Sequence, residues 1–237
     1  IIAEMAWRSG DPGIVFMDRI NWDNPNPQLG AIESTNPCGE QPLLPYESCT
    51  LGSINLARMV QDQSINWPHL AITIDTAVHF LDNVIDMNRH PTPQVGEMQK
   101  MTRRIGLGVM GFADMLIQLG VPYDCQDGLN IATSLMRFIR SQTHLASQRL
   151  AKIRGVFPAW ENSIYNQGPP WQIRNSAPTT IAPTGTISII AGVSSGIEPL
   201  FAVSYIRNVM DNTRLVEVHP YFEAVARHEG FYSPELM

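Results

Sequence analysis

A thiol, a carboxylate and an amide are crowded into one short stretch of the 237-residue sequence. Residues 35–42 read TNPCGEQP, a loop pattern with prolines on both sides of the cysteine. Because side chains two positions apart on an extended backbone point to the same side, Asn36, Cys38 and Glu40 can face one substrate. A thiol can act as a nucleophile, metal ligand or carrier of hydrogen atoms, a carboxylate can accept a hydroxyl proton, and an amide can hold a second hydroxyl. The stretch is a candidate catalytic loop. An ordinary turn remains open, in which Asn36 caps the backbone, Cys38 is a small buried side chain and Glu40 is solvated.

A second thiol, Cys49, follows in the stretch YESCTLGSIN. Two thiols near one site are compatible with metal binding, a redox pair or coincidence. The spacing from Cys38 is wrong for a zinc knuckle, which needs pairs of ligands two to four residues apart and usually four ligands in all. We therefore favour redox chemistry. The third cysteine, Cys125, matches no motif, and so low a count argues against a secreted disulfide framework and for a reducing, cytoplasmic setting.

A glycine between hydroxyl-bearing residues marks a second candidate site, in the stretch APTGTIS at 182–188. At the start of a helix, such residues present free backbone N–H groups and the positive end of the helix dipole to an anion. The stretch lacks the lysine of a Walker A motif, and an ordinary helix cap is the simpler alternative for an isolated Thr-Gly-Thr. The pattern indicates a phosphate cradle made of Thr184, Gly185, Thr186, Ile187 and Ser188.

The elements that could hold these loops are predicted from the spacing of apolar residues. Helical spacing over His69–Asn88, Thr102–Leu119 and Asp127–Arg154 predicts three helices. Residues Thr179–Ala182 and Phe201–Val209 are rich in side chains that fit a pleated surface, which predicts two strands. Strands separated by helices favour an α/β fold with parallel strand pairs.

Two features of the second predicted helix concern its packing. Gly106, Gly108 and Gly111 suggest that its backbone approaches its neighbours closely. The adjacent Arg103 and Arg104 could meet a phosphate, but we expect a solvated or helix-capping pair.

Composition and charge limit the class of protein. Hydrophobic residues make up 44% of the sequence and charged residues 16%, which is ordinary for a globular protein with a sizeable core. The net charge of -6, from 22 acidic and 16 basic residues, is spread without long like-charge runs, so we expect no binding to a nucleic-acid polymer. The longest apolar runs fall far short of the roughly 20 residues that cross a bilayer, so we expect no membrane association.

The sequence shows no sign of a domain boundary. No repeat or Gly/Ser-rich linker divides it, so residues 1–237 are expected to form a single domain segment. The part from Gly10 to Pro45 is rich in Pro, Asn and Gly and is expected to form long loops with short extended pieces. The sequence begins without Met and stops in a polar stretch, which suggests an excerpt that lacks N- and C-terminal parts of a longer chain.

At these motifs the sequence resembles the catalytic chain of ribonucleotide reductases, from about Gly10 to Val209. The stretch NPCGE resembles the family's radical-bearing finger loop, Cys49 falls where the adenosylcobalamin-dependent members carry a reducing cysteine, and PTGTIS resembles the substrate-phosphate loop. The forms NPCGE and SSGIEP are more similar to the adenosylcobalamin-dependent class II than to the di-iron-dependent class. The resemblance implies a ten-stranded α/β barrel, of which this chain is a part, with a central finger loop that carries Cys38 at its tip.

The resemblance also implies a reaction, the conversion of ribonucleotides, expected to be ribonucleoside diphosphates, to 2'-deoxyribonucleotides for DNA synthesis. Homolysis of the cobalt–carbon bond of adenosylcobalamin would lead to a thiyl radical on Cys38, which takes the 3'-hydrogen of the ribose. Glu40 would act as the base on the 3'-hydroxyl, Asn36 would hydrogen-bond the substrate, and Cys49 would supply reducing equivalents. The partner of Cys49 in the family's disulfide-forming pair is expected upstream of Ile1, so this segment alone is expected to be inactive.

The implied partners are a ribonucleotide substrate and a thioredoxin-like or glutaredoxin-like protein, which acts as the external dithiol reductant. Allosteric nucleotides are expected to bind outside this segment. The resemblance is compatible with a monomer or a homodimer, and no metal ligated by protein side chains is expected within residues 1–237.

Three alternatives compete with this interpretation. A di-iron-dependent reductase would keep the radical in a partner subunit, although the form of the motifs disfavours it. A nucleotide-binding or regulatory module without catalysis would be expected to lose Cys38 or Glu40, and both are present. A glycyl-radical enzyme shares the barrel and a finger-loop cysteine, but its C-terminal glycine motif is not found in this sequence. Adenosylcobalamin-dependent ribonucleotide reduction is the favoured hypothesis.

Overall fold

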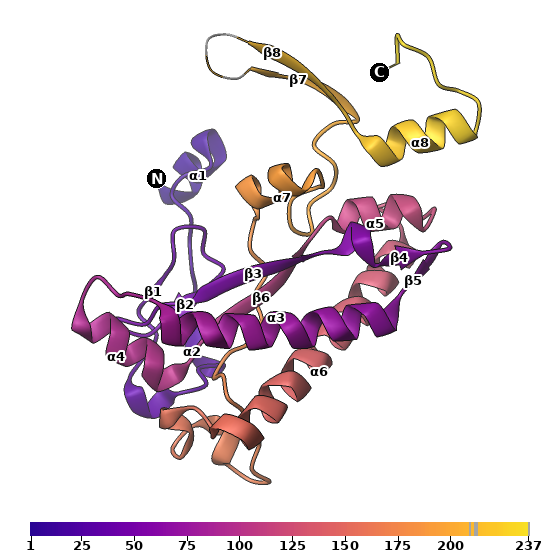
Figure 1. Ribbon diagram of the computed structural model, residues 1–237. Coiled ribbons are helices and arrows are strands. Elements are labelled where there is room, and N and C mark those ends of the chain that lie inside the picture. The colour runs from indigo at the N-terminus through magenta and orange to yellow at the C-terminus, as the bar shows by residue number, and fades with distance from the viewer. Residues whose placement is uncertain (209, 211–212, 237) are drawn as a thin grey trace.

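The computed structural model describes residues 1–208, 210 and 213–236 (Figure 1). Its helices are α1 Ile2–Ser9, α2 Met17–Trp22, α3 Trp67–Met87, α4 Pro93–Thr102, α5 Phe112–Gln118, α6 Gln126–Arg154, α7 Gly185–Ala191 and α8 Pro220–His228. Its strands are β1 Ser34–Thr35, β2 Pro42–Leu43, β3 Thr50–Asn55, β4 Val60–Gln61, β5 Ser64–Ile65, β6 Ile105–Met110, β7 Ser204–Asn208 and β8 Arg214–Val218. Short 3-10 turns occur at Pro27–Leu29, Leu56–Met59, Pro158–Trp160 and Ile164–Asn166.

Three parallel segments lie side by side at the centre of the molecule. β3 pairs with β6 along the full length of both strands. On the other edge of β6, the extended residues 177–180 add a third parallel segment, in which Thr179 pairs with Leu107. The amide of Thr180 donates to the carbonyl of Leu107 at 3.1 Å. This arrangement confirms the predicted α/β fold with parallel pairs, although β3 and β6 were not among the predicted strands and the predicted strand Thr179–Ala182 pairs only at its beginning.

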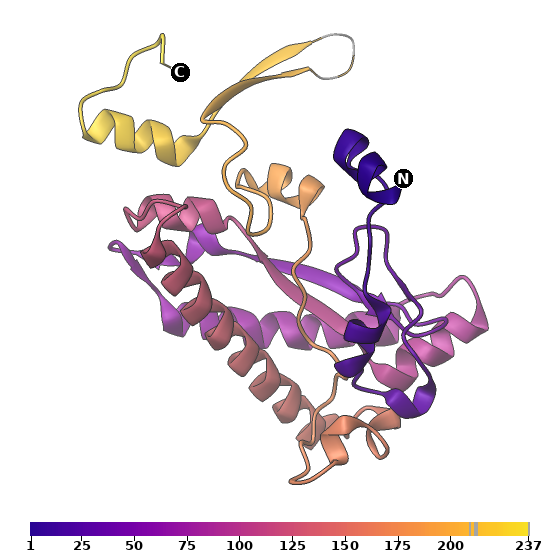
Figure 2. The ribbon, with the colours of Figure 1, turned by 180° about the vertical axis from the view of Figure 1, so that it is seen from behind.

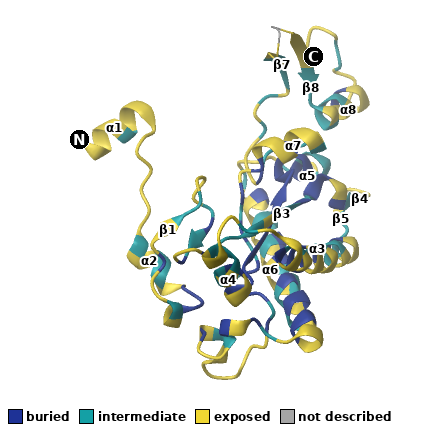
Figure 3. Cartoon of the chain, turned by 60° about the vertical axis from the view of Figure 1, so that its left-hand side comes forward, coloured by how far each residue is buried: buried dark blue, intermediate teal, exposed yellow. Residues whose placement is uncertain are grey.

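Two long helices cover these segments, as Figures 1 and 2 show. α3 packs on β3 and β6, and α6 packs along α3. The predicted apolar positions Ile74, Val78, Leu81 and Ile85 of α3 are at most 2% exposed, and burial of each such side chain contributes about 1.5 to 3 kcal/mol. Figure 3 shows the buried residues along both helices. Both helices were predictable because one apolar stripe runs along each. The main core comprises Ile54, Leu56, Met59, Leu70, Ile74, Val78, Leu81, Ile85, Ile105, Leu107, Val109, Phe112, Met115, Leu116, Leu135, Ile139, Ala146 and Leu150.

The predicted helix Thr102–Leu119 is wrong over its first half. Residues Ile105–Met110 form the strand β6, and the helix α5 begins only at Phe112. All six residues of β6 are buried, and a strand buried on both faces has a continuous apolar run that periodicity cannot distinguish from a helix. The close approach suggested by the glycines is real, since a methyl group on Gly108 would lie 2.6 Å from the carbonyl oxygen of Thr180.

The arginines before β6 were expected to be solvated or to cap a helix, and the first of these alternatives is wrong. Arg103 and Arg104 are 4% and 5% exposed. Arg103 occupies the C-cap of α4 by its backbone, but its guanidinium donates to the fully buried carboxylate of Asp82 at 2.9 Å. Arg154 and Arg174 donate to the same carboxylate, at 3.1 and 3.5 Å. These ion pairs hold together four segments of the chain, which are α3, the residues before β6, the end of α6 and the residues leading to the third parallel segment.

The N- and C-terminal parts lie outside this core. The stretch Gly10–Pro45 is mostly loop, as predicted, with the short elements α2, β1 and β2. The predicted strand Phe201–Val209 is confirmed over Ser204–Asn208, while Val209 lies outside the described residues. β7 and β8 form an antiparallel hairpin that extends away from the parallel segments, followed by α8 (Figure 1). Among the described helices, none has the length and apolar character needed to cross a bilayer.

We predict that Gly108→Ala destabilises the protein by about 1 to 3 kcal/mol, because the added methyl group would overlap the Thr180 backbone, which cannot rotate away. The measurement is urea unfolding of the full-length protein. Gly52→Ala on the neighbouring strand is the matched control, since its methyl group would make an ordinary 3.4 Å contact with Leu81. Equal stability of the two variants would contradict the close approach.

Candidate functional site

Cys38 lies in the turn of a tight hairpin formed by β1 and β2. The hairpin is closed by two hydrogen bonds between Asn36 and Gln41. The backbone amide of Asn36 donates to the backbone carbonyl of Gln41 at 3.1 Å, and Oδ1 of Asn36 accepts from the backbone amide of Gln41 at 3.0 Å. The turn passes through Gly39 at a φ of 85°, in the left-handed region that favours glycine. Cys38 is exposed, so the buried thiol of the ordinary-turn interpretation is not observed. Asn36 does cap the turn, and its Nδ2 donates to no acceptor among the described residues, which leaves it available for a ligand.

The hairpin is fixed to the parallel segments by the two residues that precede its second strand, Glu40 and Gln41. The hydroxyl of Thr180 donates to the carbonyl of Glu40 at 2.9 Å. Gln41 is 3% exposed and packs where Gly106 leaves room, since a methyl group there would lie 2.6 Å from Gln41 Nε2. The hairpin therefore lies beside the beginning of β3, and its turn projects toward the side on which α7 lies (Figures 1 and 3).

The carboxylate of Glu40 is partly shielded and incompletely bonded. Its Oε2 is buried and has no hydrogen-bond partner among the described residues. A buried acceptor left without a donor costs about 1 to 3 kcal/mol. This oxygen can accept a hydroxyl proton or hydrogen bond from a bound molecule without first breaking a protein contact.

Cys49 lies just before β3 in a setting that keeps its thiol protonated. Burial raises the pKa of Cys49 to about 12, the nearby Arg104 opposes this shift, and the carboxylates of Glu47 and Glu40 add to it. The influence of Glu40 shows that the structure brings these two predicted site residues into one neighbourhood. A protonated thiol here can act as a proton or hydrogen donor but is a poor nucleophile at neutral pH.

A buried ion pair lies beside Cys49 that the sequence did not reveal. Arg104 Nε and Glu47 Oε1 are 2.9 Å apart, with both side chains at most 6% exposed. Neither atom makes a well-aligned hydrogen bond, so the contact is one of charge rather than of directed bonding. The other carboxylate oxygen of Glu47 accepts from the amide of Leu44 at 3.0 Å. The pair connects the loop that carries Cys49 to the start of β6.

The second predicted site surrounds the start of α7. Residues 185–187 are exposed, and their amides donate to no acceptor among the described residues. Thr184 stands at the N-cap with a φ of 57°, and its Oγ1 accepts from the amide of Gly196 at 2.7 Å. Ser188 is 1% exposed, and its hydroxyl lies 3.1 Å from that of Ser195. Of the five predicted phosphate contacts, Thr184 and Ser188 thus have side chains committed to the protein, while the three residues between them are open.

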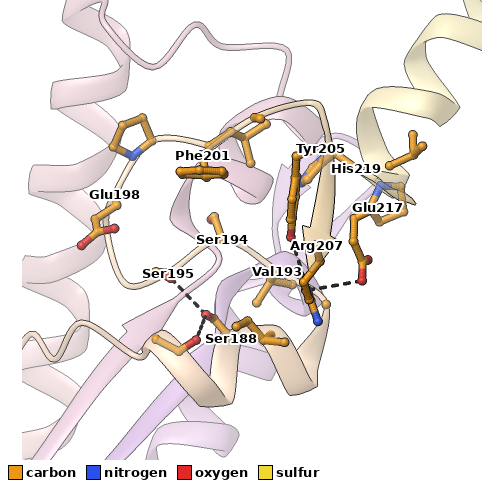
Figure 4. Close-up of a pocket in the computed structure, with 18 residues that line it drawn as sticks. Ser188, Val193, Ser194, Ser195, Glu198, Phe201, Tyr205, Arg207, Glu217 and His219 are labelled. Atoms are coloured by element: carbon orange, nitrogen blue, oxygen red, sulfur yellow. Dashed lines mark hydrogen bonds and ion pairs between the residues drawn. The ribbon is translucent and has the colours of Figure 1, made fainter. Parts of the chain in front are cut away.

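A pocket of about 390 Å³ adjoins α7 (Figure 4). One wall is formed by the first turns of α7 and the loop that follows it, including Ser188 and Ser195. The opposite wall comes from β7 and β8, where Arg207 lies 3.4 Å from Glu217 and donates to the hydroxyl of Tyr205. The pocket therefore combines hydroxyls, an aromatic ring and a partly paired cation.

The hairpin and the start of α7 are separate parts of the site. β3 and β6 begin beside the hairpin, whereas the loop after α7 meets the end of β6, where the amide of Gly111 donates to Ser194. No hydrogen bond or ion pair joins Cys38, Glu40 or Cys49 to residues 184–188 in the described part of the chain.

Sequence reasoning also missed Asp114 and His219. Asp114 is fully buried and accepts hydrogen bonds from Ser194 and His219. The two residues are 105 positions apart, so no local motif connects them. A polar residue inside the otherwise apolar stretch Phe112–Leu116 was the available signal for Asp114.

Comparison with known proteins agrees with these features. The chain belongs to the ribonucleotide reductase barrel-domain family, whose model matches residues 1–236. It is 55% identical to the vitamin B12-dependent ribonucleoside-diphosphate reductase of Thermoplasma acidophilum, over 100% of this chain and 31% of that protein. It is 52% identical to the protein of the same name from Mycobacterium tuberculosis, over 100% of this chain and 34% of that protein. The chain thus spans about a third of the length of these relatives.

A solved structure shows the fold. The Actinobacillus ureae class Id ribonucleotide reductase alpha subunit superposes with a TM-score of 0.76 at 22% identity, over 99% of this chain and 43% of that subunit. The predicted family and the predicted α/β barrel architecture are confirmed. The parallel segments β3, β6 and 177–180 are the part of that architecture that carries the candidate site.

We predict that alkylation of Cys49 is about 1,000-fold slower in the native full-length protein than in the urea-unfolded chain at pH 8. The reason is that the thiolate is the reactive form and the pKa rises from 9.0 to about 12 on folding. Mass spectrometry of iodoacetamide-treated peptides measures both rates. As the pH is raised toward 12, the native rate should climb and the difference should shrink. A native rate at pH 8 close to the unfolded rate would contradict the assigned environment.

Proposed function

We propose that the full-length protein is an adenosylcobalamin-dependent ribonucleoside-diphosphate reductase, which makes 2'-deoxyribonucleotides for DNA synthesis. The observation that carries the proposal is the hairpin, in which an exposed thiol at Cys38 is followed by a buried, unpartnered carboxylate oxygen at Glu40. The names of the relatives that are 52% and 55% identical over the whole chain support the cofactor and the diphosphate substrate.

The accessibility of Cys38 fits a cofactor that acts from outside the core. Adenosylcobalamin supplies radical chemistry when bound, because its cobalt–carbon bond breaks homolytically. Among the described residues no group of three or more His, Cys, Asp or Glu side chains is arranged to hold a metal ion, and we assign no cobalt ligand within them. The exposed turn lets the Cys38 thiol give up its hydrogen atom without movement of the packed strands.

Each of the three hairpin residues Cys38, Glu40 and Asn36 then has a separate role toward the ribose. The thiyl sulfur of Cys38 takes the hydrogen atom from the 3'-carbon, so that an S–H bond forms as the C–H bond breaks. Glu40 accepts the proton of the 3'-hydroxyl at its free Oε2, which favours departure of the 2'-hydroxyl. Asn36 holds the substrate through its free Nδ2, since its Oδ1 is committed to the turn.

Cys49 supplies the proton and, with a second cysteine outside residues 1–237, the two electrons of the reduction. Its raised pKa keeps Cys49 as a thiol until the 2'-hydroxyl leaves. The thiol then gives its proton to that hydroxyl, which departs as water. The two cysteines are oxidised to a disulfide, the 2'-carbon gains hydrogen, and Cys38 returns its hydrogen atom to the 3'-carbon. An external dithiol protein, thioredoxin-like or glutaredoxin-like, would reduce the disulfide for the next turnover.

The start of α7 is the proposed contact for the substrate phosphates. The open amides of residues 185–187 and the hydroxyl of Thr186 can donate to phosphate oxygens, and Thr184 and Ser188 shape the turn that presents them. A ribonucleotide with its ribose at the hairpin and its phosphates at α7 would connect the two parts of the site. Allosteric nucleotides would bind elsewhere in a monomeric or homodimeric, cytoplasmic enzyme.

We predict that Cys38→Ala abolishes turnover of the full-length protein to background, because no other side chain can carry the hydrogen atom. Its thermal unfolding should stay close to that of the unaltered protein, since an exposed turn residue contributes little packing. Cys125→Ser is the matched control, because Cys125 caps α6 and a serine keeps that role. Activity of Cys38→Ala near that of the control would refute the mechanism.

The cofactor requirement is tested by anaerobic reduction of CDP with a dithiol, with and without adenosylcobalamin. We expect dCDP only when the cofactor is present. Product that instead requires a di-iron partner subunit would reject the cobalamin assignment and leave the roles of Cys38 and Glu40 in place.

We predict that Glu40→Gln lowers kcat by at least about 100-fold with little change in CDP binding, because the amide keeps the shape of the side chain but cannot accept the proton.

A further inference from the structure

Asp114, on the first turn of α5, accepts hydrogen bonds from two other segments. Its Oδ2 accepts from the amide and the hydroxyl of Ser194, at 2.7 and 2.6 Å. Its Oδ1 lies 2.7 Å from Nε2 of His219. Burial alone would raise the pKa of Asp114, but the hydrogen bonds from His219 and Ser194 bring it below its usual range. The side chain is therefore a charged acceptor whose bonds all go to the protein.

His219 is held in a single neutral form by its second nitrogen. Nδ1 accepts from the amide of Phe222 at 3.2 Å, as the N-cap of α8. Because Nδ1 accepts, the proton must sit on Nε2, which donates to Asp114. His219 thus attaches the start of α8 to α5 through Asp114.

Ser194 begins a chain of contacts that ends at the first turn of α7. The carbonyl of Ser194 accepts from the amide of Gly111 at 2.8 Å, so both sides of this residue are fixed. Its neighbour Ser195 contacts the hydroxyl of Ser188, as the dashed line in Figure 4 shows. Two residues after Ser194, the amide of Gly196 donates to Thr184 at 2.7 Å. The loop therefore holds α7 at both Thr184 and Ser188, on either side of the open amides.

We propose that Asp114 is a positioning residue for nucleotide binding, which fixes loop 194–196 and through it the phosphate-facing turn of α7. This inference rests on the proposed function. Asp114 contacts no reacting atom, so its removal should weaken substrate binding and leave the chemistry at the hairpin intact. A purely structural role would lower stability without a selective effect on KM.

The inference is tested with Asp114→Asn in the full-length protein. The amide has one acceptor oxygen where the carboxylate has two, so it cannot accept both from Ser194 and from His219, and its Nδ2 places a donor against one of them. We expect KM for CDP to rise about 10-fold, equivalent to about 1.4 kcal/mol of binding, while kcat changes by less than about 2-fold. The dissociation constant of CDP, measured by calorimetry with adenosylcobalamin absent, should rise by the same factor.

Further variants separate positioning from general stability. Ser194→Ala keeps the backbone bond to Asp114 and loses the hydroxyl bond, so KM should rise by a smaller factor in a protein that folds even if Asp114→Asn does not. His219→Gln should lower the melting temperature with KM nearly unchanged, since the bonds of Ser194 remain. The matched control is Asp75→Asn on α3, which removes the charge from the exposed ion pair that Asp75 makes with Arg149.

The outcomes distinguish the inference from the function on which it rests. Unaltered KM and CDP affinity in folded Asp114→Asn or Ser194→Ala, with normal activity of the parent protein, would overturn the inference alone. Failure of the parent protein to reduce or bind CDP would overturn the proposed function. A loss of kcat without a change in KM would also refute the positioning role, because it would place Asp114 in the chemistry.

Discussion

The close packing of backbone against backbone at β6 is the constraint on which the site depends. At Gly108 there is no room for a methyl group against the carbonyl of Thr180, and Gly106 leaves space for Gln41. This contact sets the position of the third parallel segment, and that segment in turn holds the hairpin through Thr180 and leads directly into α7. The positions of the hairpin and of α7 thus both depend on the close contacts that Gly106 and Gly108 allow.

Burial and neighbouring charges together set the pKa of Cys49. A thiol in a buried setting resists ionisation, and the carboxylates of Glu40 and Glu47 strengthen that resistance while Arg104 moderates it. Burial of one Glu40 oxygen without a donor makes that oxygen a stronger acceptor for a bound hydroxyl. The candidate site therefore combines a protonated thiol at Cys49 with an unpartnered carboxylate oxygen at Glu40.

The sequence was sufficient for elements whose pattern is local. The helices α3 and α6 follow from apolar stripes, and the loop that carries Asn36 and Cys38 follows from its composition, although its hairpin form was not predicted. β6 could not be recognised, because a fully buried strand lacks alternation and its glycines resemble those of a packed helix. Asp114 and His219 were missed, and the burial of Arg104 was not foreseen, because their partners Ser194 and Glu47 lie far away along the chain.

The buried carboxylate of Asp82 has a consequence for how the molecule assembles. Its arginine partners come from three places, next to β6, at the end of α6 and before residue 177, and Asn175 adds a further bond at 3.1 Å. A partly assembled chain that had buried Asp82 with one partner missing would carry uncompensated charge at a cost of several kcal/mol. Docking of α6 and insertion of the third segment therefore favour each other, which makes folding cooperative over this region and penalises compact states in which a segment has taken the wrong place.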